Sequence, residues 1–126
     1  MANPLADLAD AALARLPEHD SITFEGRVQT NVQLADRAAR MATGLQRLGV
    51  QPGDRIAVVL PNCPEVLLTY QAVWRAGAAA TPVISAVSPV ELRHVLADSG
   101  ARLLVTEDPR LAAAADVPVL DLAALR

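Results

Sequence analysis

The sequence predicts an α/β fold in which βαβ units build a mainly parallel, layered sheet. Short apolar runs alternate along the chain with helical segments that end at glycines. The clearest run, Ile56 to Leu60, is apolar at every position. This continuity is typical of a strand that is covered on both faces. The order strand, helix, strand then recurs, and the right-handed connections of such units predict one layered sheet.

The composition suits an aliphatic core in a chain of 126 residues, enough for one domain or for part of a larger one. The eleven cationic side chains are all arginine, and the net charge is −3 without a clustered basic stripe. Nucleic acid and anionic membrane surfaces are therefore not expected as partners. The lone Cys63 excludes an internal disulfide and a cysteine metal cluster. The sequence shows neither a basic signal region nor a membrane-length apolar run, which predicts a soluble cytoplasmic protein.

Two elements are predicted at the start of the chain. An amphipathic helix is expected over residues 4–16, and Pro17 ends it. Its apolar stripe consists of Leu5, Leu8, Ala12 and Leu16. Weak alternation over residues 22–28 predicts an extended segment that forms a hairpin, with its turn at Glu25-Gly26.

A longer helix is predicted to begin after Thr30, which forms a capping box with Gln33. Its apolar stripe consists of Leu34, Ala38, Met41, Leu45 and Leu48. Gly49 is expected to cap this helix in the left-handed conformation, so that Val50 folds back onto the last turn. Pro52-Gly53 then fits the centre of a type II turn.

The βαβ pattern recurs after the strand over residues 56–60. Pro64 suits the first turn of a helix that ends at Gly77 and leads into a strand over residues 79–84. The predicted inner face of this helix carries Leu67, Tyr70 and Trp74. Ser88 and Glu91 form a second capping box. A helix is predicted after it, with Leu92, Val95 and Leu96 on its buried face and its end at Gly100. A strand over residues 103–105 and a short helix that begins at Asp108-Pro109 follow. The last predicted elements are a strand over residues 117–120 and a further element that begins at Asp121.

The sequence lacks the loops by which open α/β sheets hold phosphate. The six glycines stand at positions 26, 44, 49, 53, 77 and 100, which excludes a G-x-G-x-x-G loop. The absence of lysine excludes a Walker A loop. A response regulator needs an acidic residue where a strand ends, and the best strand ends in Leu60-Pro61-Asn62 instead.

The reactive single residues are each better explained by structure than by catalysis. Cys63 stands in a capping turn with no histidine near it in the sequence. His94 falls beside the apolar stripe of a predicted helix, and His19 lies in a polar loop. Two histidines cannot form a convincing metal site. Core packing is the expected role of Tyr70 and Trp74.

The two residues just before the first sheet strand are also better explained by structure than by ligand binding. Asp54 and Arg55 could touch a ligand, but Asp54 is expected to complete the turn that precedes the strand.

A series of short motifs resembles the N-terminal region of the adenylate-forming superfamily, which includes acyl-CoA synthetases, luciferases and nonribosomal peptide adenylation domains. The matching residues, in order, are Gln33-Leu34-Ala35, Gly44-Leu45, Leu48-Gly49-Val50, Pro52 to Val58, Leu60 to Glu65, Ala72 to Ala78, Thr81-Pro82-Val83, Glu91-Leu92 and Asp98 to Ala101. The series covers roughly residues 20–107. Two departures are Asn31, where the family usually has an aromatic residue, and residues 85–88, which replace an asparagine-proline opening near the substrate side.

The resemblance implies an acyl-CoA synthetase-like fold and a two-step ligase reaction. A carboxylate is activated by Mg-ATP to an acyl-adenylate, and a thiol, usually that of coenzyme A, then displaces AMP. In this family, the reactive parts all lie downstream of the matched region: the loop that binds phosphate, the nucleotide contacts, the acidic residue that coordinates magnesium and the catalytic lysine. The resemblance therefore assigns no catalytic, cofactor-binding or metal-binding residue to this chain.

Two hypotheses follow for residues 1–126. In the first, the chain is the N-terminal segment of a ligase, inactive alone, and the missing downstream domain is its packing partner; ATP, magnesium and coenzyme A serve the full-length enzyme. In the second, it is a free-standing binding or oligomerisation module derived from such an enzyme. A sheet cut from its neighbours is expected to expose a face and an apolar edge, which weighs against the second hypothesis. A third interpretation, an unrelated Rossmann-like binder, lacks its phosphate loop.

Overall fold

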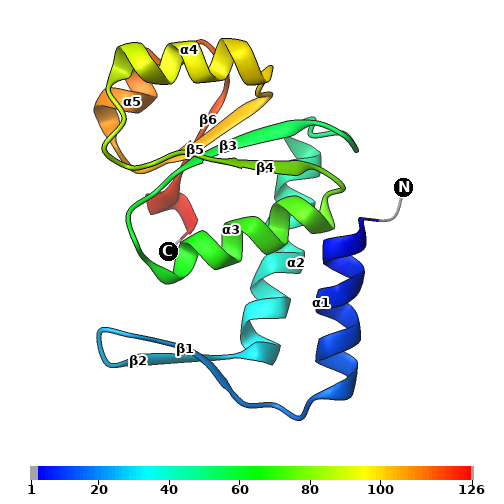
Figure 1. Ribbon diagram of the computed structural model, residues 1–126. Coiled ribbons are helices and arrows are strands. Elements are labelled where there is room, and N and C mark those ends of the chain that lie inside the picture. The colour runs from blue at the N-terminus through cyan, green and yellow to red at the C-terminus, as the bar shows by residue number, and fades with distance from the viewer. Residues whose placement is uncertain (1–2, 126) are drawn as a thin grey trace.

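A computed structural model describes residues 3–125 and confirms the α/β fold. A four-stranded parallel sheet has the strand order β4-β3-β5-β6 (Figure 1). Its strands are β3 (Arg55–Val59), β4 (Ala79–Pro82), β5 (Leu103–Thr106) and β6 (Val119–Asp121). A separate antiparallel hairpin, formed by β1 (Asp20–Phe24) and β2 (Arg27–Thr30), projects beyond the helices at the far end from the sheet.

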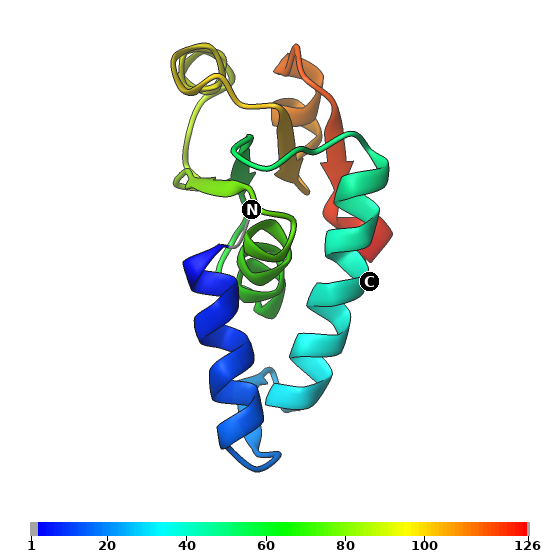
Figure 2. The same ribbon diagram turned by 90° about the vertical axis from the view of Figure 1, so that its right-hand side faces the viewer.

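Helices cover both faces of the sheet. The helices are α1 (Pro4–Arg15), α2 (Asn31–Arg47), α3 (Pro64–Arg75), α4 (Pro89–Ser99) and α5 (Pro109–Ala114), followed by the 3-10 turn η1 (Leu122–Leu125). α2 and α3 pack on one face and α4 and α5 on the other, while α1 lies outside against α3 (Figure 2). The expectation of an uncovered sheet face was therefore wrong, because the chain supplies helices for both sides.

Alternation along the central strands produces two cores. Ile56 and Val58 of β3 point into the larger core with α2 and α3, while Ala57 and Val59 point into the smaller core with α4 and α5. β5 divides its side chains in the same way. All four of these β3 side chains are at most 2 % exposed, as the uninterrupted apolar run predicts for a strand covered on both faces.

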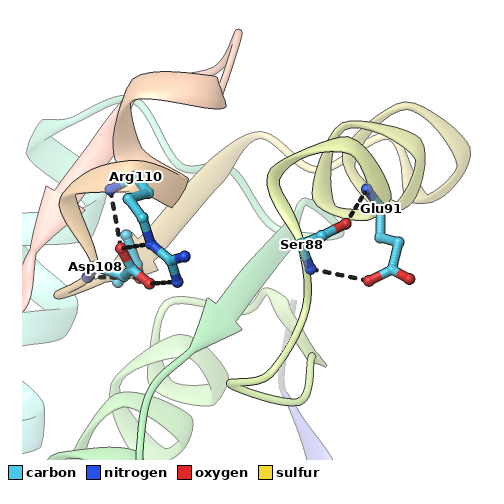
Figure 3. Close-up of polar contacts among 5 residues, drawn as sticks. Ser88, Glu91, Asp108 and Arg110 are labelled. Atoms are coloured by element: carbon cyan, nitrogen blue, oxygen red, sulfur yellow. Dashed lines mark hydrogen bonds and ion pairs between the residues drawn. The ribbon is translucent and has the colours of Figure 1, made fainter.

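Both predicted capping boxes are present. The Thr30 hydroxyl accepts from the Gln33 backbone N–H at 3.1 Å, and the Gln33 side chain accepts from the Thr30 N–H at 2.9 Å. Ser88 and Glu91 exchange the same two bonds at the start of α4 (Figure 3). Each box satisfies N–H groups that have no partner within their helix, so these two helix starts are fixed by local sequence.

The predicted turns also form. At the end of α2, Gly49 has a φ of 93° and the Val50 N–H donates back to the Leu45 carbonyl at 3.1 Å. The Asp54 N–H closes the turn around Pro52-Gly53 by donating to the Gln51 carbonyl at 3.1 Å.

The hairpin turn is confirmed as well. Glu25 and Gly26 have φ values of 50° and 76°, the positive pair that a two-residue type I′ turn requires.

The predicted helix faces were wrong at several positions. In α3, Leu67 is 48 % exposed, and the buried face instead carries Leu68, Thr69, Ala72 and Val73. Leu5 and Leu8 of α1 are both 46 % exposed or more, and the residues that cap the ends of α1 and α2, Leu16 and Leu48, are 44 % and 51 % exposed. In α3 the reason is tertiary, because the positions of the sheet, α2 and α1 around the helix determine which of its apolar residues are buried. The strand predicted over residues 79–84 ends at Pro82, and Ile84 is 74 % exposed.

Within residues 3–125, no helix is long and apolar enough to span a bilayer.

Candidate functional site

The candidate site is an open hollow of about 440 Å³ at the carboxyl ends of β3 and β4. Ligands of open α/β sheets bind in crevices outside the carboxyl ends of the strands. Here the lining comes from the ends of β3 and β4, from the connections that follow them and from α3; Figure 1 shows where these elements lie. The lining residues are Val58, Leu60, Pro61, Asn62, Val66, Tyr70, Pro82, Val83, Ile84 and Ser85.

Local sequence explains why the two connections diverge at this edge. Pro82 is the last residue of β4, and the Val83 N–H makes one further bond to the Val58 carbonyl at 2.9 Å. The chain then turns: the Val87 N–H donates to the Ile84 carbonyl at 3.1 Å, and the Val87 side chain is buried in the smaller core. This anchor leaves Ile84 at the surface and places the unusual 85–88 segment beside the hollow.

The hollow offers contacts rather than reactive groups. Most of its lining is aliphatic, with polar atoms contributed by Asn62, Tyr70 and Ser85. None of the ten lining residues carries a carboxylate, an imidazole or a guanidinium. Such a surface can bind an apolar group and orient it by a few hydrogen bonds, but it holds no group able to act as a general base at neutral pH.

Metal and phosphate chemistry find no support in residues 3–125. No cluster of three or more histidine, cysteine, aspartate or glutamate side chains in this range could hold a metal ion. The five positive-φ glycines, at positions 26, 49, 53, 77 and 100, belong to separate turns, so none of them builds a loop of successive N–H groups around an anion. Residues 3–125 therefore contain neither a metal-binding cluster of three such side chains nor a glycine-built anion loop.

Cys63 behaves as a structural residue. It occupies the N-cap position of α3, but its side chain makes no capping bond. Burial raises the pKa of its thiol, and the Glu65 carboxylate raises this pKa further through its charge and a hydrogen bond. Because the thiolate is the nucleophilic form, these effects lower the thiolate fraction, and with it the reactivity of the sulfur, at a given pH.

Both histidines lie at the surface, as predicted for His19 from its polar loop. His19 is exposed and its Nδ1 lies 2.9 Å from the Pro17 carbonyl oxygen, and His94 is exposed on α4. Asp54 completes its turn by accepting from the Gln51 N–H at 2.8 Å, which confirms the predicted role.

Of the two large aromatic residues of α3, Tyr70 packs against the larger core. Tyr70 and Trp74 are half-buried and stack on each other with ring centroids 6.3 Å apart. Tyr70 also lines the hollow, together with Val66 of the same helix.

Sequence reasoning missed the role of Asn31. Its Oδ1 accepts from the His19 N–H at 2.9 Å, and its Nδ2 donates to the Pro17 carbonyl at 3.3 Å. These bonds fasten the segment between α1 and the hairpin to the start of α2. Each bond joins the Asn31 side chain to a backbone group twelve or more residues away in the sequence, so no local pattern reveals it.

A smaller groove lies between α1 and α2. Its walls include Ala9 and Leu13 of α1 and Leu34 of α2, and its volume is about 200 Å³. Arg75 lines it and binds Asp10 of α1 at 2.7 Å, while its Nε has no hydrogen-bond partner within the described residues. The groove therefore lies where α1 packs against α2 and α3.

Comparison with known proteins decides the family. The sequence model of the AMP-binding enzyme family matches residues 9–125, which is most of the chain. This chain belongs to the AMP-binding enzyme family. The match extends beyond the resemblance over residues 20–107 at both ends.

Relatives with assigned activities support this membership. A feruloyl-CoA synthase of an Amycolatopsis species is 42 % identical over 93 residues, which are 73 % of this chain and 19 % of the relative. A long-chain-fatty-acid–CoA ligase of Bacillus subtilis is 36 % identical over 101 residues, 80 % of this chain and 18 % of the relative. The chain thus spans about a fifth of the length of these relatives.

Solved structures of the family share the fold. NpsA of Klebsiella oxytoca in complex with 3-hydroxyanthranilyl-AMSN has a TM-score of 0.88 at 26 % identity, over 99 % of this chain and 26 % of the NpsA chain. VinN in complex with 3-methylaspartate has a TM-score of 0.88 at 28 % identity, over 96 % of this chain and 35 % of the VinN chain. The fold is therefore that of an acyl-CoA synthetase-like adenylation domain in the part that the chain covers.

Proposed function

We propose that this chain is the N-terminal scaffold segment of an AMP-forming carboxylic acid–thiol ligase. The observation that carries the proposal is the family match over residues 9–125, together with close structural similarity over nearly the whole chain. The relatives named as CoA ligases use carboxylic acids as different as ferulate and long-chain fatty acids, so the proposal names the reaction class and leaves the acid open.

The proposed reaction has two steps. A carboxylate oxygen attacks the α-phosphorus of ATP, which forms the acyl-adenylate and releases pyrophosphate. A thiol, proposed to be that of coenzyme A, then attacks the acyl carbon; the new carbon–sulfur bond replaces the bond to AMP, and the thiol proton is lost. The first step makes AMP the leaving group in place of a carboxylate oxygen, which leaves poorly.

The role proposed for residues 3–125 is to shape and support rather than to react. The hollow beside Tyr70 and Ile84 is open, and none of its ten lining residues carries a carboxylate, an imidazole or a guanidinium for acid–base work. We place the magnesium-nucleotide contacts and the catalytic lysine in parts of the ligase that pack against this edge of the sheet. ATP and coenzyme A make the cytoplasm the expected compartment.

Carboxylate-dependent exchange of labelled pyrophosphate into ATP tests the proposal, because this exchange reports the first step alone. The purified chain is expected to show no exchange above the no-enzyme rate with ferulate, a long-chain fatty acid or acetate. Exchange by residues 1–126 alone would overturn the scaffold role, since it would require a nucleotide site within this chain.

A second candidate, the non-catalytic module, is favoured by one observation: both faces of the sheet are covered by helices of this chain. It predicts a folded monomer or a defined oligomer without any partner. Size-exclusion chromatography and the near-ultraviolet circular dichroism of Trp74 separate the two candidates. An aggregated product without a tertiary aromatic signal excludes the module, whereas a folded product that binds no ligase segment supports it.

A further inference from the structure

We draw no further inference here: the strongest candidate, the groove between α1 and α2 that Arg75 lines, carries nothing because the Arg75 Nε is too deeply buried for a ligand to reach, the guanidinium already pairs with Asp10, and nothing in the structure shows what covers the apolar wall.

Discussion

The backbone N–H of Gly53 donates a hydrogen bond to the carbonyl of Gly77 at 3.0 Å. Both glycines have a positive φ, 88° and 80°. This bond joins the turn that precedes β3 to the turn that ends α3, so the two parallel strands that follow them start in register, with Arg55 opposite Ala79. The register of β3 and β4 is therefore set at their amino ends, whereas the hollow lies at their carboxyl ends.

Gly77→Ala is expected to destabilise the fold. A Cβ at this position would lie 3.3 Å from the Pro52 Cβ, and its backbone would be held at a left-handed φ. The conformational term alone costs about 1–2 kcal/mol, and the contact adds to it. Urea unfolding followed by Trp74 fluorescence measures the loss.

Gly44→Ala is the matched control for that substitution. Gly44 lies within α2 and a Cβ there meets nothing within 4 Å. Alanine is favoured over glycine inside a helix by about 0.5–1 kcal/mol, so this variant is expected to gain stability. Equal effects of the two substitutions would contradict the role assigned to the Gly77 turn.

The two fully buried threonines are expected to respond in opposite ways to valine. The Thr69 hydroxyl has no hydrogen-bond partner within residues 3–125, so Thr69→Val removes an unsatisfied polar atom and is expected to stabilise by up to about 1 kcal/mol. The Thr106 hydroxyl accepts from the Asp108 N–H at 3.2 Å. Thr106→Val is expected to cost about 1 kcal/mol. Thermal and urea unfolding compare the two variants, and destabilisation by both would mean that Thr69 has an unrecognised partner, such as a buried water.

The pH dependence of Cys63 alkylation tests the environment of α3's first turn. Burial first, and then Glu65, raise the pKa of the thiol, so the pH at which the iodoacetamide rate reaches half its maximum is expected above that of a free cysteine. Glu65→Gln removes the negative charge, stabilises the thiolate and moves this midpoint to lower pH. The midpoint stays above the ordinary value because burial, the larger cause, remains. An unchanged midpoint in the variant would show that Glu65 does not act on the thiol.

Sequence predicted the parts of the fold that are determined by local chemistry. The capping boxes at Thr30 and Ser88 need only residues three positions apart, and the turn at Pro52-Gly53 needs only its own backbone preferences. The buried face of α3 could not be predicted in this way, because that helix is apolar on most sides. Which stripe faces the sheet depends on the positions of α1 and α2, which no window within residues 64–75 contains.

The candidate site was predictable only in its location. Two strand ends at one sheet edge follow from the βαβ pattern, but Tyr70 reaches the hollow from the second turn of a helix, and Ile84 is exposed because Val87 anchors the loop instead. These placements arise from packing between segments distant in the sequence. The resemblance implies that the reactive groups of the family lie downstream of residues 20–107, and the sequence assigns no catalytic residue to this chain.

A segment exchange between ligases tests the scaffold role most directly. In the Amycolatopsis feruloyl-CoA synthase, the segment that corresponds to residues 9–125 is replaced by residues 9–125 of this chain, and ferulate-dependent exchange of pyrophosphate into ATP is measured. We predict that the soluble hybrid retains exchange, and that the same hybrid carrying Gly77→Ala is less thermostable. A hybrid that is folded and as stable as the parent, yet shows no exchange, would contradict the scaffold role, because this chain would then lack something that the scaffold must supply.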